Sequence, residues 1–156
     1  MSGRRVVVGV GNALRGDDAV GIAVAERLRG RVPEDVDVVE CEQEPSRLLD
    51  AWGGADVALV VDACASAEPP GTVYRFDVSG EPLPARVFRS STHAFGVGDA
   101  VELARALERL PRQVVVYGVE GGQFAAGAAL SPEVESAVEQ VAEEVIRELR
   151  GDGHDA

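Results

Sequence analysis

Two short runs of apolar residues constrain the fold of this chain more than any other feature. Residues 6–10 read Val-Val-Val-Gly-Val and residues 57–61 read Val-Ala-Leu-Val-Val, with no polar side chain in either. A strand with one face in water alternates apolar and polar residues, whereas a strand covered on both faces is apolar throughout. The sequence therefore predicts buried, mainly parallel strands in an α/β domain.

Helical segments alternate with these strands along the chain. Apolar residues recur with helical spacing in residues 17–30, 45–52, 99–107 and 131–149. Further strands are predicted at residues 36–41, 72–78 and 113–119. The connection into residues 72–78 is too short for a crossover helix, so this strand is expected to run antiparallel to its neighbour. The predicted fold is a three-layer sandwich: a mostly parallel, twisted five-stranded sheet with one antiparallel strand and helices on both faces.

Polar residues are expected to cap three of the helices. Asp17 or Asp18 is predicted to cap the first, Asp99 begins the third, and Ser131 precedes a first-turn proline in the last. The apolar stripe of the third helix is predicted to consist of Ala100, Leu103, Ala104 and Leu107.

Length and charge limit the class of protein. The 156 residues fit one domain, predicted at residues 1–150, followed by a flexible polar tail at 151–156. The net charge of −12 argues against binding to nucleic acid or to anionic membranes. The longest apolar runs are too short for a secretory signal or a membrane span, so a cytoplasmic protein is expected. A monomer is expected as well.

Several catalytic designs are excluded by missing residues. The chain has no Lys, so a phosphate-loop lysine and a lysine Schiff base are ruled out. Cys41 and Cys64 stand alone, without the spacing of a zinc or iron–sulfur site. Only two histidines occur, His93 and His154, and no Gly-x-Ser-x-Gly motif is present.

The remaining polar candidates follow the predicted strands. In open α/β sheets, ligands bind beyond the carboxyl ends of the strands. Asp17 and Asp18 follow the first strand, Asp62 closes the third, and His93 lies in a loop before a helix. Each has an ordinary alternative, such as capping a helix or hydrogen bonding within a loop. Together, two carboxylates and an imidazole form a ligand set that suits a divalent ion such as Zn²⁺ or Ni²⁺.

The glycine-rich loop at residues 9–16 allows a second interpretation. It resembles a dinucleotide-binding fingerprint, but Leu14 occupies the position of the third glycine. Asp17 and Asp18 would also repel a phosphate at the start of the next helix. A small-molecule or nucleotide hydrolase using this loop is therefore the less favoured alternative.

Five segments of the sequence resemble the hydrogenase maturation protease family. Residues 9–21, Gly-Val-Gly-Asn-Ala-Leu-Arg-Gly-Asp-Asp-Ala-Val-Gly, are similar to the family's first signature. The other similar segments are residues 60–63, 92–96, 118–120 and 130–134. Since the five occur in the family's order, the resemblance extends over almost the whole chain.

This resemblance implies a function and a site. Family members cut a C-terminal extension from the large-subunit precursor of [NiFe] hydrogenases once nickel is inserted. Asp18, Asp62 and His93 match the family's metal-contacting positions and are the expected catalytic residues, with nickel supplied by the substrate. Either the metal or a carboxylate could activate the attacking water. A non-catalytic module that senses a metal-loaded partner is the alternative with the same residues.

Two departures from the family pattern concern the same site. Residues 40–45 read Glu-Cys-Glu-Gln-Glu-Pro where many members have a glycine-rich turn. This segment is expected to alter substrate preference and to help attract a cationic tail. Asp18 is one methylene shorter than the Glu found in some members, which would change ligand geometry slightly.

Overall fold

The fold was examined in a computed structural model, which describes residues 3–42, 44–84 and 96–151. Its strands are β1 (Arg4–Val10), β2 (Val36–Cys41), β3 (Ala55–Cys64), β4 (Val73–Asp77) and β5 (Gln113–Glu120). They form one sheet in the order β2-β1-β3-β5-β4. The pairs β1/β2, β1/β3 and β3/β5 are parallel, and β4/β5 is antiparallel. The predicted mixed five-stranded sheet is confirmed.

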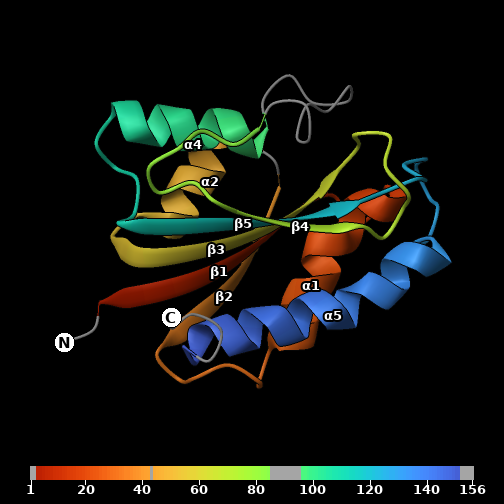
Figure 1. Cartoon of the computed structure of the whole chain (residues 1–156), viewed down its shortest axis with the longest axis horizontal. Helices are drawn as coiled ribbons and strands as arrows, with labels where there is room; N and C mark the ends of the chain where they lie inside the picture. Colours follow the sequence, from red (N-terminus) through yellow and green to blue (C-terminus); the bar gives the residue numbers. More distant parts are fainter. Residues whose placement is uncertain (1–2, 43, 85–95, 152–156) are drawn as a thin grey trace.

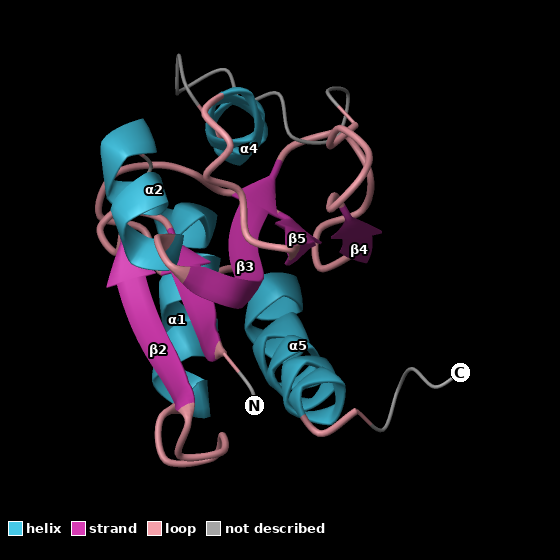
Figure 2. Cartoon of the chain, turned by 90° about the vertical axis from the view of Figure 1, so that its left-hand side faces the viewer, coloured by secondary structure: helices cyan, strands magenta, loops and turns pink. Residues whose placement is uncertain are grey.

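Helices cover both faces of this sheet. They are α1 (Val20–Leu28), α2 (Pro45–Trp52), α4 (Val97–Ala106) and α5 (Pro132–Leu149), with the 3-10 helix η1 (Gly16–Ala19) leading into α1. Figure 1 shows α2 and α4 above the sheet and α1 and α5 below it, and Figure 2 gives the same layers from the side. Each helical layer closes its own apolar cluster against the sheet. The three-layer sandwich is therefore as predicted.

Strand β1 shows why its sequence is apolar throughout. Val7 packs into the cluster under α1 and α5, whereas Val6 and Val8 pack into the cluster under α2 and α4. All three side chains are fully buried. Because successive side chains of a strand point to opposite faces, a strand between two helical layers needs apolar residues at every position.

Helix α5 follows its sequence pattern closely. Ser131 is the N-cap residue and Pro132 occupies the first turn, as predicted. The expected inward stripe is buried and consists of Val134, Val138, Val141, Val145 and Leu149. This helix packs beside α1 on the lower face of the sheet (Figure 1).

Helix α4 corrects one prediction. The helix begins at Val97, two residues before Asp99, and the Asp99 carboxylate accepts a hydrogen bond from the N–H of Gly96 (3.1 Å). Leu103 and Leu107 are 38% and 51% exposed, so they do not belong to the core. The buried stripe is Val97, Ala100, Val101 and Ala104. The earlier start brings Val97 into the helix, and a stripe spaced from Val97 leaves both leucines at its margin.

Strand β3 is longer than its apolar run. It continues through Cys64, so the prediction that it ends at Asp62 is wrong. Asp62 is paired in register with Gly118 of β5, and Cys64 with Glu120. Pairing with β5 therefore extends β3 beyond Asp62, the charged residue that ends its apolar run.

Some predictions fall on parts of the chain without a description. Residues 85–95, which include His93, and residues 152–156, which hold most of the expected tail, lie outside the described residues. A single domain over residues 1–150 remains a prediction. None of the described helices is long and apolar enough to cross a membrane.

Candidate functional site

The loop after β1 folds back onto η1. The N–H of Asn12 donates to the carbonyl oxygen of Asp18 (3.1 Å), and the Asn12 side chain accepts from the N–H of Leu14 (2.9 Å). A Cβ atom at Gly11 would lie 2.0 Å from the same Asp18 oxygen, so only glycine fits there. The first family-like segment thus fixes the position of Asp18 relative to β1.

Asp17 does not cap a helix. Helix α1 begins after Ala19 with no side-chain cap, which contradicts the prediction that Asp17 or Asp18 would serve. The fully buried Asp17 carboxylate instead accepts hydrogen bonds from the N–H of Gly122 (2.8 Å) and from the N–H and hydroxyl of Ser131 (2.7 and 2.9 Å). Asp17 therefore ties η1 to the connection between β5 and α5, which is a structural role.

Asp18 and Asp62 are brought to the same end of the sheet. Asp18 is 6% exposed and Asp62 is 2% exposed. η1, which carries Asp18, contacts β3, which carries Asp62. The Asp62 carboxylate accepts a hydrogen bond from the N–H of Ala63 (2.8 Å). Burial of two carboxylates at one end of a sheet is unusual, because a charged group loses hydration there.

The third predicted ligand, His93, lies outside the described residues. Helix α4, which follows it in the sequence, runs opposite to β5, so its first turn is directed toward the carboxyl ends of the parallel strands (Figure 1). Among the residues described, no three His, Cys, Asp or Glu side chains are grouped as a metal site. Two of the three predicted ligands are therefore described, and the complete set stays a prediction.

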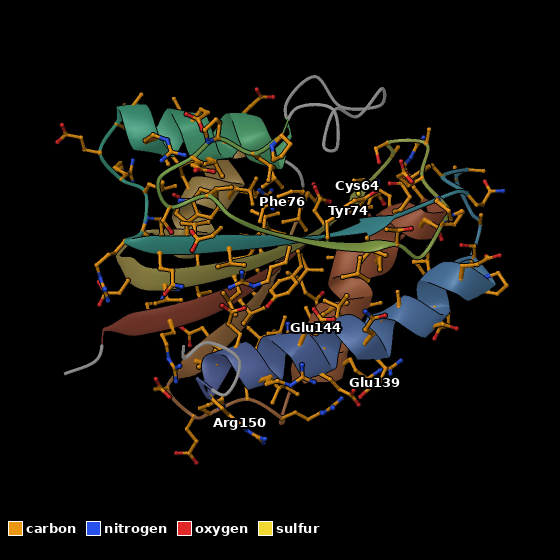
Figure 3. The ribbon with its side chains drawn as sticks, viewed as in Figure 1. Cys64, Tyr74, Phe76, Glu139, Glu144 and Arg150 are labelled. Carbon is orange, nitrogen blue, oxygen red and sulfur yellow. The ribbon has the colours of Figure 1, made fainter. Side chains whose placement is uncertain are left out.

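Glu120 is a buried acid that the sequence analysis did not include in the site. It ends β5 and is 1% exposed. Its carboxylate accepts hydrogen bonds from the N–H and hydroxyl of Ser66 (both 2.6 Å) and from the hydroxyl of Tyr74 (3.2 Å). The Cys64 thiol lies 3.7 Å away, and Figure 3 shows Cys64 and Tyr74 in the same region of the sheet. Asp62 was chosen as a candidate because it is an acid that follows an apolar run. Glu120 also follows an apolar run, so the same criterion identifies it.

The surroundings of both cysteines favour the neutral thiol over the thiolate. Burial, reinforced by the charge of Asp62, raises the pKa of the Cys41 thiol to about 11. Burial, reinforced by Glu120 and then Asp62, raises the pKa of the Cys64 thiol further. Both are free thiols. Since the thiolate is the nucleophile in cysteine chemistry, these side chains do not suit a cysteine protease.

A groove opens at the end of β2, between this strand and the loop that follows β1. This β2 groove has a volume of about 390 Å³, and its lining includes Gly11, Asn12, Leu14, Cys41, Glu42 and Arg47. Leu14 is 75% exposed. A larger cavity of about 770 Å³ lies near the C-terminal end of α5, away from the buried acids. Neither Asp18 nor Asp62 lines the smaller groove, but its Asn12 bonds to the backbone of Asp18, so the groove lies next to the segment that carries this acid.

The acidic segment at the groove has specific local roles. The Glu44 side chain accepts hydrogen bonds from the N–H of Arg47 and the hydroxyl of Ser46, and it caps α2. Glu40 pairs with Arg29 (3.1 Å). These contacts reduce the charge available to attract a cationic tail, so that expectation rests mainly on Glu42.

The glycine loop leaves no evident cradle for a phosphate. A Cβ atom at Gly16 would lie 2.3 Å from the carbonyl oxygen of Gln123, and the Gly16 N–H donates to Ala128 (3.1 Å). The connection after β5 therefore fills the space beside the loop. With Asp17 and Asp18 buried behind it, this arrangement disfavours the nucleotide alternative.

Comparison with known proteins gives a consistent result. The sequence model of a family described as hydrogenase maturation protease matches residues 22–148. The hydrogenase 2 maturation protease of Escherichia coli strain K12 is 29% identical over 157 residues, covering 98% of this chain and 94% of that protein. The solved structure of the hydrogenase maturating endopeptidase HybD from E. coli is similar, with a TM-score of 0.81, 28% identity, and coverage of 96% and 94%. A [NiFe] hydrogenase maturation protease HycI from Thermococcus kodakarensis KOD1 gives a TM-score of 0.74, 27% identity, and coverage of 94% and 92%.

Proposed function

Because this chain belongs to the hydrogenase maturation protease family and is a peptidase, we propose that it removes the C-terminal extension of a [NiFe] hydrogenase large-subunit precursor. In this proposal the precursor already carries nickel, which is part of the substrate. The burial of both Asp18 and Asp62 at the carboxyl end of the sheet is the observation that carries the proposal.

Asp18, Asp62 and His93 are proposed to contact the nickel of the precursor. Two carboxylate oxygens and an imidazole nitrogen are donors that a borderline divalent ion accepts. Two carboxylates held at one poorly solvated site repel each other, and a cation offered by the precursor relieves that repulsion. Binding would therefore favour the loaded precursor over the empty one, which makes the site a checkpoint for nickel insertion.

Hydrolysis requires a water molecule to attack the carbonyl carbon of the scissile peptide bond. In one route, the carboxylate of Asp62 or Asp18 takes a proton from this water, and the departing amine receives a proton as the C–N bond breaks. In the other route, the precursor's nickel polarises the carbonyl or the water. Both routes use the same two acids, since these either hold the proton or hold the ion.

A cleavage assay tests the proposal directly. Nickel-loaded precursor is incubated with the protein, and the shortened chain is measured by mass spectrometry. Asp62→Asn and His93→Ala are expected to reduce the rate at least about a hundredfold, in line with the loss of a catalytic acid–base group. Asp50→Asn, on the exposed face of α2, is the matched control and should cleave at the parental rate. Circular dichroism checks that each variant is folded.

The possible outcomes separate the parts of the proposal. If both site variants cleave at the parental rate, the assignment of the site is wrong. If nickel-free precursor is cut as efficiently as the loaded form, the checkpoint is wrong while the protease function stands. Binding of the loaded precursor without shortening would favour the sensing module instead.

A further inference from the structure

Strand β2 is an edge strand whose outer backbone groups can be identified. β2 pairs with β1 alone, and the Cys41 carbonyl accepts a hydrogen bond from the N–H of Gly11 (3.1 Å). In a parallel pair, alternate residues of a strand turn their N–H and C=O groups to the same neighbour. Since Cys41 faces β1, the backbone groups of Val38, Glu40 and Glu42 face outward.

The first half of this edge is closed by a side chain. Arg29 donates from Nη1 to the Val38 carbonyl oxygen (3.1 Å) and from Nη2 to the Glu40 carboxylate (3.1 Å). The bond to Val38 agrees with the outward direction derived from Cys41. Proteins commonly protect exposed edges with charged side chains, because an open edge accepts a foreign strand.

The second half of the edge is open and ends next to the β2 groove. Within the described part of the chain, no group bonds to the outward N–H and C=O of Glu40 or to the N–H of Glu42. Glu40 and Glu42 both line the groove, and the exposed Leu14 stands on its wall. Arg29 thus covers the outward backbone groups of β2 up to Val38, and the outward groups of Glu40 can still pair with another chain.

The groove next to the open edge also borders the segment that carries Asp18. Asn12, which lines the groove, donates its N–H to the Asp18 carbonyl oxygen (3.1 Å). Cys41, between the two outward-facing glutamates, is close enough to Asp62 for its pKa to be raised by that charge. Since β1 lies between β2 and β3, a chain leaving this edge would turn over the groove, across the carboxyl ends of β2 and β1, to reach Asp62.

On the premise of the proposed function, we propose that the segment of the precursor next to the scissile bond adds to β2 as an extra strand. Its main chain pairs with the N–H and C=O of Glu40 and with the N–H of Glu42, whose carbonyl oxygen already accepts from the N–H of Glu44 (2.8 Å). One of its side chains packs on Leu14. Backbone pairing supplies affinity for an extended chain of any sequence, while the pocket for alternate side chains supplies selectivity. The occupant must have free N–H groups, so proline within the paired segment is excluded.

Hydrogen–deuterium exchange of the protein tests the pairing without relying on cleavage. In short labelling pulses, nickel-loaded precursor is expected to slow exchange at the Glu40 and Glu42 amides. The Glu34 amide, in the exposed turn at the other end of β2, is the internal control and should be unchanged. Precursor that is cleaved without slower exchange at these amides would overturn the inference and leave the proposed function intact. Slower exchange without cleavage would support this docking mode and remove the proposed function.

Proline substitution tests the same contact kinetically. Glu42→Pro removes one outward N–H and is expected to raise KM roughly fivefold, the effect of one net hydrogen bond, with less than a twofold change in kcat. Glu42→Ala keeps the N–H and should raise KM less. Glu34→Pro, in the turn that begins at Pro33, is the control for proline itself and should cleave at the parental rate. An equal rise for Glu42→Ala and Glu42→Pro, or no rise for Glu42→Pro, would overturn the inference.

Discussion

The two ends of the sheet use acidic residues in opposite ways. At the amino end, Asp37 pairs with Arg4 (2.9 Å) and Asp35 with Arg5 (3.1 Å), and both acids remain more than half exposed. At the carboxyl end, four acids are at most 6% exposed: Asp17, Asp18, Asp62 and Glu120. An exposed ion pair keeps its hydration and contributes little to the free energy of unfolding. A buried acid has lost its hydration and needs hydrogen-bond donors of the protein to replace it. Buried acids are therefore concentrated at the carboxyl end of the sheet, whereas the acids of these two pairs at the amino end are exposed.

The four buried acids also differ among themselves. Asp17 accepts from the connection before α5, and Glu120 accepts from Ser66 and Tyr74. Each joins segments that are distant in sequence. Asp18 and Asp62 are the pair that we propose to contact the precursor's nickel. The comparison predicts that removing a joining acid affects mainly stability, whereas removing a site acid affects mainly cleavage.

The largest effect is expected for Asp17→Asn. The amide would place a donor among donors from Gly122 and Ser131, so we expect a loss of about 3 kcal/mol and a fall in Tm of roughly 10 °C. Asp37→Asn at the amino end is the matched control and should lose less than about 1 kcal/mol, a loss that 1 M salt reduces. Urea unfolding followed by circular dichroism measures both. Equal losses for the two variants would contradict the distinction between the ends.

A smaller effect is expected for Glu120→Gln. The amide keeps one acceptor oxygen but loses the charge that receives both hydrogen bonds from Ser66, so the free energy of unfolding should fall by about 2 kcal/mol. Glu133→Gln, exposed in the first turn of α5, is the control and should change stability by less than about 0.5 kcal/mol. Precursor cleavage by folded Glu120→Gln should stay within a fewfold of the parent. A hundredfold loss would place Glu120 in the reaction itself.

Local patterns predicted much of this molecule. The five strands and the inward stripe of α5 follow from apolar spacing, because burial on one or two faces leaves a direct trace in sequence. The antiparallel direction of β4 follows from the short connection before it. Asp62 was found because it interrupts an apolar run. The same reasoning missed Glu120, since the predicted strand stopped one residue early at 119.

Long-range contacts could not be predicted in the same way. Asp17 is held by groups more than 100 residues away, and nothing near Asp17 in the sequence identifies them. The open edge of β2 depends on strand order, which apolar spacing does not determine. The start of α4 was also misplaced, because Gly96 lacks a side chain that would mark a cap. His93 stays a prediction from the family resemblance.

The smallest expected effect measures the charge at the carboxyl end through a thiol. Cys41 has a pKa of about 11, raised first by burial and then by Asp62, and lowered by Arg47. Alkylation by iodoacetamide at pH 9 proceeds through the thiolate, so its rate follows this pKa. Asp62→Asn removes a negative charge, lowers the pKa of the Cys41 thiol and should speed its alkylation roughly threefold. Arg47→Gln removes a positive charge and should slow it.

Peptide mass spectrometry separates the alkylation of Cys41 from that of the more deeply buried Cys64. The pKa of Cys64 is raised further, so this thiol should react more slowly in every variant. Because the two substitutions have opposite signs, general loosening of the fold cannot imitate the result: it would accelerate both. An unchanged rate in Asp62→Asn would mean that the Asp62 charge does not reach the β2 groove, and the predicted path from that groove to the buried acids would then be wrong.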